Sequence, residues 1–125
     1  VHSIRNVGGT TASFVVFERL DSPLPAPSDH RHADQLPTGV RALLEDPDLG
    51  VLEVELQPGE AQALHTGGWR AIYSLTDYTV EWRENDEVGH RTWSAGDAHW
   101  HEPGPHAAEN VGETTARWVI VAYGS

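Results

Sequence analysis

Residues 96–110 read Gly-Asp-Ala-His-Trp-His-Glu-Pro-Gly-Pro-His-Ala-Ala-Glu-Asn, and they show most directly what kind of fold to expect. Within this stretch, residues 98–101 alternate two histidines with a small and an aromatic side chain. Turn-forming Gly, Pro and Asp residues flank this run at 95–97 and at 103–105. A run of this length between such residues predicts a short β-strand bounded by turns.

The same pattern recurs along most of the chain. Strands are predicted at 51–56, 71–75, 79–82, 90–93, 98–101 and 117–121, with turns such as Pro58-Gly59 between them. Many short strands at this spacing indicate an all-β fold, either a β-sandwich or a small barrel. One short helix is predicted over 38–46, because Val40, Leu43 and Leu44 have helical spacing after Pro37-Thr38.

Composition limits the partners that the chain can have. The 125 residues carry 8 Arg and no Lys against 19 Asp and Glu, which gives a formal net charge of −11. Such a surface repels phosphate backbones and anionic lipids, so we expect neither nucleic acid nor a membrane as partner. Separately, we expect a cytoplasmic location. The chain has no Cys, which excludes disulfides and thiolate zinc sites. Its 8 His are unusually many, and His is suited to proton transfer near neutrality and to metal binding, so they are the first candidates for functional residues.

The two ends of the chain are similar to each other. Residues 2–17 align with residues 106–121 at a constant offset of 104, with eight of sixteen positions identical. The apolar run 14–17 corresponds to the predicted strand at 118–121, so the physical pattern matches as well. We therefore expect residues 1–20 to be the tail strand of an upstream repeat, or a strand swapped into this domain. The Pro-rich residues 21–35 are predicted to be a linker, and residues 36–125 the barrel.

Several residues between about 50 and 121 together resemble the two-motif signature of the cupin superfamily. The form that they resemble most is the small stand-alone or tandem cupin. Its first motif reads His-x-His-Pro, and its second combines Gly-Asp, Trp, Glu, His and Glu-Asn. The matching residues here are Pro58-Gly59, His65, Leu75-Thr76-Asp77, Gly96-Asp97, Trp100, Glu102, Pro103-Gly104-Pro105, His106 and Glu109-Asn110.

This resemblance implies a fold, a cofactor and an assembly. Cupins are antiparallel jelly-roll barrels that hold a divalent transition metal inside, commonly Fe, Mn, Ni or Zn. Many are dimers, and tandem cupins are common, which agrees with the internal repeat. We expect such a barrel, with one short helix and an N-terminal extension, in a homodimer or a tandem cupin.

The expected metal site is incomplete in this sequence. His65 and His106 match two of the ligand positions of the family, but Gly67 stands where the second His of the first motif would be. The acidic ligand that many cupins add would fall at Ala71 or Arg70, and neither can ligate. Two imidazoles alone make a weak site, since stable transition-metal sites usually have three or four protein ligands.

A replacement ligand is available on the strand at 98–101. His99 and His101 share one face of this strand, opposite Trp100. If that face turns inward, His101 can complete a metal site with His65 and His106, and His99 can contribute to it. If Trp100 turns inward instead, both histidines lie on the surface. The predicted metal ligands are therefore His65, His106 and His101.

Two classes of function follow. In the first, the protein is a metal-dependent enzyme, such as a dioxygenase or another oxygenase, an isomerase or a lyase, acting on a small oxygen-rich organic substrate. Trp69, Tyr73 and Gly67 would then form the substrate pocket. In the second, the protein is a non-catalytic cupin that binds a small ligand or a partner, with a degenerate or absent metal site.

Overall fold

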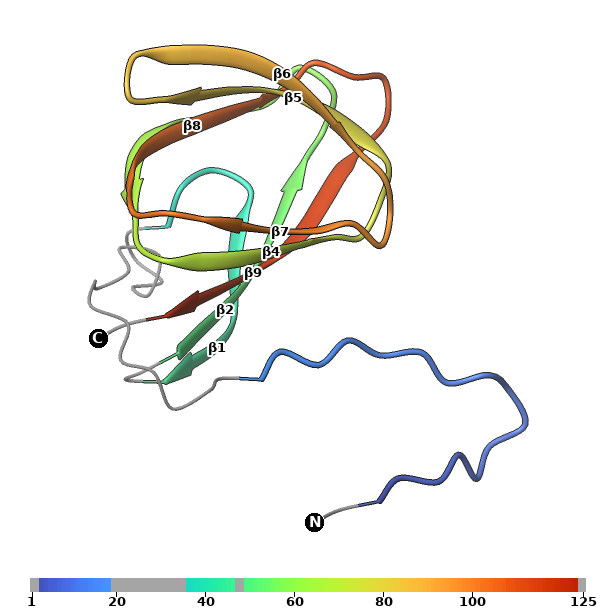
Figure 1. Ribbon diagram of the computed structural model, residues 1–125. Helices are drawn as coiled ribbons and strands as arrows, with labels where there is room; N and C mark the ends of the chain where they lie inside the picture. The colour runs from blue at the N-terminus through green and yellow to red at the C-terminus, as the bar shows by residue number, and fades with distance from the viewer. Residues whose placement is uncertain (1–2, 19–35, 47–48, 124–125) are drawn as a thin grey trace.

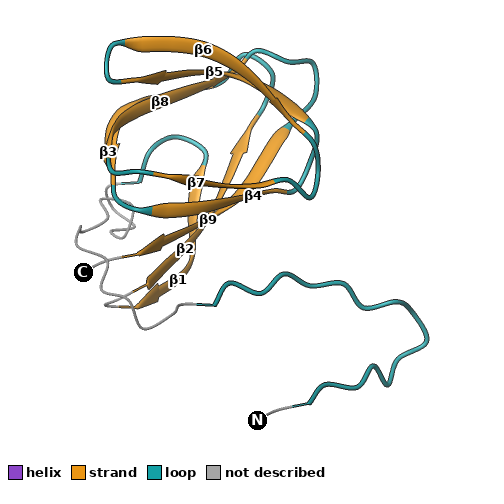
Figure 2. Cartoon of the chain, viewed as in Figure 1, coloured by secondary structure: helices purple, strands orange, loops and turns teal. Residues whose placement is uncertain are grey.

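The structure, a computed structural model, describes residues 3–18, 36–46 and 49–123. These residues form nine β-strands and no helix, which confirms the all-β jelly roll (Figures 1 and 2). The strands are β1 (Val40–Asp46), β2 (Leu49–Leu56), β3 (Ala61–Gly67), β4 (Arg70–Ser74), β5 (Tyr78–Glu84), β6 (Glu87–Trp93), β7 (Ala98–His101), β8 (Gly104–Asn110) and β9 (Ala116–Tyr123).

The strands make two antiparallel sheets that face each other (Figure 1). One sheet has five strands in the order β1-β2-β9-β4-β7, and the other has four in the order β3-β8-β5-β6. Successive strands often lie in different sheets, so residues far apart in the sequence become neighbours. In this arrangement β9, the last strand of the chain, lies inside its sheet between β2 and β4.

The hydrophobic core lies between the two sheets. Alternate residues of β2 are fully buried at Leu52, Val54 and Leu56, as the period of two along a strand requires. Trp118 of β9 meets Tyr78 of β5 across the core, with ring centroids 5.1 Å apart. Burying each such side chain stabilises the fold by about 1.5–3 kcal/mol.

The helix predicted over 38–46 is wrong, because this segment is the strand β1. β1 pairs with β2 from Val40 opposite Val54 to Asp46 opposite Leu49. A bulge between Ala42 and Leu44 interrupts this register. An extra residue in a strand shifts the alternation, so the apolar side chains acquired a spacing that resembled a helix. The pairing with β2 outweighs the weak local preference.

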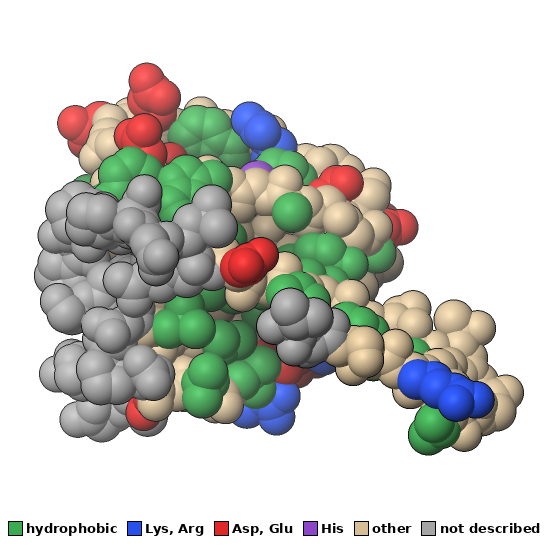
Figure 3. All heavy atoms as spheres, turned by 60° about the horizontal axis from the view of Figure 1, so that its bottom comes forward, with side chains coloured by type: hydrophobic (Ala, Val, Ile, Leu, Met, Phe, Trp, Pro, Cys, Tyr) green, Lys and Arg blue, Asp and Glu red, His purple; other side chains and the backbone are tan. Residues whose placement is uncertain are grey.

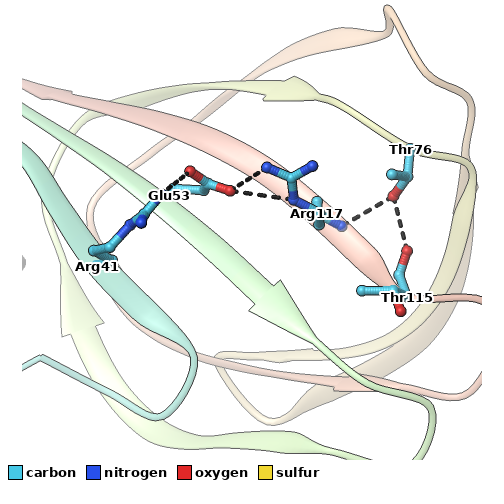
Figure 4. A network of polar contacts seen from close by, with 5 residues as sticks. All are labelled: Arg41, Glu53, Thr76, Thr115 and Arg117. Atoms are coloured by element: carbon cyan, nitrogen blue, oxygen red, sulfur yellow. Dashed lines mark hydrogen bonds and ion pairs between the residues drawn. The ribbon is translucent and has the colours of Figure 1, made fainter.

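A polar network on the outer face of the five-stranded sheet ties its strands together (Figure 4). The Glu53 carboxylate accepts hydrogen bonds from Arg117 and, at 2.7 Å, from Arg41. Hydrogen bonds from Arg117 and Arg41 lower the pKa of Glu53. Thr76 receives the Arg117 backbone N–H at 3.0 Å and donates to the Thr115 carbonyl at 2.9 Å. The network links β1, β2 and β9 to the turn that follows β4.

The N-terminal residues lie apart from this barrel. Residues 3–18, here called the arm, contain no strand and extend away from the sheets (Figure 1). The predicted linker at 21–35 lies outside the described residues. Among the described residues, there is no helix long and apolar enough to cross a membrane.

Candidate functional site

A cavity of about 590 Å³ opens between the two sheets. Both sheets contribute to its wall, with polar groups from β3 to β8 and aromatic rings from β5, β6, β7 and β9. The polar and ring-bearing residues of the wall include Gln62, Arg70, Tyr78, Trp82, Glu84, Asn85, Arg91, Trp93, His99, Trp100, His101, Glu102, His106 and Trp118.

Two of the histidines in this wall come from β7 and face inward. In the register between β7 and β4, His101 lies opposite Arg70 and His99 opposite Ile72. Arg70 and Ile72 are both buried, so the same face of β7 points into the barrel. Trp100 lies on the other face and is 48% exposed. The structure thus selects the inward option for His99 and His101.

His99 is held against an aromatic ring. Its imidazole stacks on the Trp93 indole with ring centroids 3.8 Å apart and planes 6° apart. Its Nδ1 atom is buried and makes no hydrogen bond to any described residue. Burial, and then the nearby charges of His101, Arg91 and Arg70, lower the pKa of His99 to about 4. The ring is therefore neutral near pH 7 and retains an unused polar atom.

His101 is neutral for the same reason. Burial, followed by the charges of Arg70 and Arg91, lowers the pKa of His101 to about 4. Its Nδ1 lies 3.1 Å from the Glu84 carboxylate, so the neutral ring donates its Nδ1–H to that oxygen. This leaves Nε2 of His101 as a hydrogen-bond acceptor. The rings of His99 and His101 are 4.7 Å apart.

Arg70 brings a positive charge into the barrel. It is 2% exposed, and its Nη1 donates to the carbonyls of Gly68 at 3.1 Å and Glu102 at 3.2 Å. Its Nη2 lies 3.9 Å from Glu84. Burial lowers the pKa of Arg70 to about 10, so the guanidinium is still charged at neutral pH. Sequence reasoning missed this role, although Arg70 shares one face of β4 with the inward Ile72 and Ser74.

Arg91 places a second guanidinium at the cavity. It pairs with the buried Val80 across β5 and β6, and its Cζ lies 5.3 Å from the centre of the Trp93 ring. Trp82 on β5 lies against Gly89 of β6, where a Cβ atom would come within 2.5 Å of the indole. Gly89 therefore leaves the space that the Trp82 ring occupies in the cavity wall.

His65 and His106 form a separate pair. They lie opposite each other on β3 and β8, with ring centroids 4.1 Å apart. The Nδ1 atom of His65 bonds to the Ala63 carbonyl at 2.7 Å, and that of His106 to the Gly104 carbonyl at 3.2 Å. His106 lines the cavity, whereas His65 is not among the lining residues. The two most distant predicted ligands are thus neighbours in space.

The residues present do not fit a divalent transition metal. Within residues 3–18, 36–46 and 49–123, no three His, Asp or Glu side chains are grouped so that they could hold an ion. His101 contacts Glu84 at 3.1 Å and lies 4.7 Å from the His99 ring, whereas His65 contacts His106. The guanidinium groups of Arg70 and Arg91 also oppose a cation beside the β7 histidines. Among the described residues, the predicted ligands His65, His106 and His101 do not form a group that could hold an ion.

The residues predicted to form the substrate pocket lie outside the cavity wall. Trp69 stacks on the outward Trp100, with ring centroids 5.7 Å apart. Tyr73 alternates with the inward Ile72 and Ser74 and therefore faces out of the barrel. Gly67 ends β3 opposite Gly104. The prediction assumed that the alternation of β3 continues into β4, but these strands lie in different sheets.

Comparisons with known proteins identify the architecture. No family model matches the sequence, and no curated protein is similar to it. A cupin domain from Bordetella pertussis Tohama I superposes with a TM-score of 0.64 at 15% identity, covering 72% of this chain and 93% of that one. A double-stranded β-helix protein from Klebsiella pneumoniae gives 0.56 at 24% identity, with 87% and 93% covered.

A structure described as a predicted enzyme is similar as well. A predicted oxalate decarboxylase from Thermotoga maritima superposes with a TM-score of 0.54 at 21% identity, and the match covers 67% of this chain and 77% of that one. At such identities the likeness concerns the fold alone, because one fold supports many chemistries. What the molecule does must be argued from the cavity itself.

Proposed function

Since this chain has the cupin fold, we propose that its barrel binds a small, planar molecule bearing a carboxylate, and that it does so without a metal ion. The observation that carries the proposal is the wall of the cavity, where two guanidinium groups accompany two neutral imidazoles.

Arg70 and Arg91 line the cavity together with Glu84 and Glu102, and the two guanidinium groups are where an anionic group can bind. Arg70 and Arg91 both lower the pKa of His99 and His101, so the two imidazoles sit in a positive potential. Glu84 is engaged by His101 at 3.1 Å and by Arg70 at 3.9 Å. A carboxylate matches the fork of donors that a guanidinium presents. The Arg91 side of the cavity is thus suited to the acid group of a ligand.

The aromatic lining favours a flat ligand. Trp82, Trp93 and Trp118 contribute to the wall, and His99 extends the Trp93 face by stacking on it. Ring systems of a ligand bind well between such faces. A volume of about 590 Å³ lies within the range of about 300–1,000 Å³ that is usual for small-molecule pockets. The cavity suits a ligand of one or two rings.

Hydrogen bonding supplies a third reason. A buried polar atom without a partner costs about 1–3 kcal/mol. The Nδ1 atom of His99 is such an atom among the described residues, and the His99 ring is part of the cavity wall. Because the atom itself is not exposed to solvent, a ligand hydroxyl reaches it only when the imidazole turns. A ligand that turns the ring recovers a cost that the empty barrel carries.

The test is a titration with matched pairs of ligands, each an aromatic carboxylic acid and its amide, followed by tryptophan fluorescence and calorimetry. We expect the acid to bind at least about tenfold more tightly than the amide, and Arg91→Gln to remove most of that difference. Arg83→Gln is the matched control, because Arg83 is exposed and contacts Glu81 at 3.1 Å outside the cavity. Equal affinity for acid and amide, or equal effects of both variants, contradicts the proposal.

A metal-dependent enzyme is the second candidate, and one observation favours it. The rings of His65 and His106 converge to 4.1 Å, as two ligands of one ion would. Elemental analysis of protein purified without a chelator or a His tag distinguishes the two candidates. The first proposal expects well under one divalent transition metal per chain. Stoichiometric metal that His65→Ala removes would establish the second candidate instead.

A further inference from the structure

The arm folds locally into a defined turn. The side-chain amide of Asn6 donates to the Thr10 carbonyl at 2.8 Å. The backbone N–H of Gly8 donates to the side-chain oxygen of Asn6 at 3.0 Å. An asparagine that bonds to the backbone on both of its polar atoms fixes the direction of the chain that follows. The arm therefore contains a built turn between residues 6 and 10.

The barrel contains the same turn between β8 and β9. Asn110 Nδ2 donates to the Thr114 carbonyl at 2.8 Å, and Gly112 N–H donates to Asn110 Oδ1 at 3.0 Å. These are the residues that align with the arm at the offset of 104. Asn110 makes one further bond, from Nδ2 to the Leu56 carbonyl at the end of β2, at 2.9 Å. That bond joins the turn to a neighbouring strand.

The residues after the two turns differ in their surroundings. In the barrel, the turn leads into β9, where Trp118 is 6% and Ile120 4% exposed. The aligned residues of the arm, Phe14 and Val16, are 65% and 71% exposed. Figure 3 shows the arm projecting from the body of the molecule. A sequence that is a core strand in one copy is thus an exposed apolar segment in the other.

We propose that the arm is the closing strand of a second barrel of the same type, encoded in the same polypeptide ahead of Val1. In that barrel residues 14–17 lie between the strands equivalent to β2 and β4. Asn6 gains the bond that Asn110 makes to Leu56. A second copy of the present barrel is a poor acceptor, because its own β9 already lies between β2 and β4.

The test compares hydrogen exchange in the 125-residue chain with exchange in the polypeptide extended to the start of its reading frame. In the short chain, we expect the amides of 14–17 to exchange freely at low and high protein concentration. In the extended polypeptide they should exchange at least about 100-fold more slowly, as amides of a core strand do. Protection that grows with concentration in the short chain would show exchange between copies and overturn the proposal.

Two substitutions in the extended polypeptide sharpen the test. Phe14→Asp places a charge at the position of the buried Trp118 and should abolish the protection of 14–17. Ser13→Asp places the same charge at the position of Arg117, on the outer face, and should leave protection within about threefold. Equal effects of the two substitutions contradict the proposal. So does an extended reading frame in which 14–17 stay unprotected.

Discussion

At the scale of single residues, the interior of the barrel is organised by charge. Two imidazoles that are usually protonated in part near neutrality are kept neutral by burial and by Arg70 and Arg91. Because they stay neutral, the folded protein loses stability in acid. The pKa of each is about 4 in the folded protein and 6.5 in an unfolded chain, so between these values the unfolded state binds more protons.

We therefore expect the free energy of unfolding to have its full value above about pH 6.5 and to fall as the pH is lowered toward 4. Each imidazole contributes at most about 1.4 kcal/mol per pH unit to this slope. His99→Asn should make the slope shallower, as measured by urea unfolding at a series of pH values. His90→Asn is the control, because His90 lies on the outer face beside Glu81. Identical slopes in all three proteins would refute the assignment.

At the scale of elements, β1 shows how pairing decides the structure of a segment. Gly39 precedes β1 with a positive φ of 78°, and its carbonyl accepts the Glu55 N–H at 2.9 Å. This turn aligns β1 on β2 at the edge of the five-stranded sheet. Only glycine adopts such a φ without strain, and the space beside Gly39 is also closed.

A comparison of two glycines tests this. A Cβ atom at Gly39 would lie 2.4 Å from the Glu55 carbonyl oxygen, whereas at Gly59, with a φ of 86°, nothing lies within 4 Å. Both alanine variants carry the cost of φ, but only Gly39→Ala also forces β1 away from β2. We expect Gly39→Ala to lower the melting temperature clearly more than Gly59→Ala. Equal losses would show that the contact has no effect.

At the scale of the whole molecule, a strongly acidic exterior surrounds a cavity whose wall contains two guanidinium groups, Arg70 and Arg91. The chain has a net charge of −11, yet two of its 8 Arg line the cavity. The exterior slows the approach of an anionic ligand, and the interior retains it once bound. The association rate of a carboxylate should therefore increase with salt over the range in which the Debye length shortens.

The barrel and the arm should also behave as independent units in the 125-residue chain. Asn110→Ala removes bonds to Leu56 and Thr114 from a fully buried side chain and should cost about 1–3 kcal/mol of unfolding free energy. Asn6→Ala removes the aligned local bond and should change this value by less than about 0.5 kcal/mol. A comparable loss in both, measured by chemical denaturation, would mean that the arm stabilises this barrel.

Much of the fold could be predicted from the sequence, because alternating strands between Gly, Pro and Asp turns leave a local signal. The strand β1 could not, since the bulge at Leu43 disturbs its period and its partner β2 is needed to define it. The site was harder. The sequence showed that His99 and His101 share a face of β7, but the inward direction depends on the pairing with Arg70 and Ile72 of β4.

The pocket depends on contacts that cross the sequence. Arg91 and Trp93 are two residues apart on β6 and therefore share a strand face, but the direction of that face depends on the register of β5 and β6, which places Arg91 opposite Val80. Similarly, Tyr73 and Trp69 look like pocket residues only if the face of β3 continues into β4. Local patterns define which residues share a face, whereas the topology defines which face is inside.

The bulge in β1 has a consequence beyond register. β1 is the outer strand of its sheet, and Leu43 and Leu44 are 49% and 50% exposed. A flat edge with two such leucines would be a template for stacking one molecule against another, and from there for fibrils. A bulge increases the local twist of an edge strand, and a twisted edge is a poorer template for a neighbouring strand. The extra residue that gave this strand a helix-like spacing therefore also disfavours self-association through this edge.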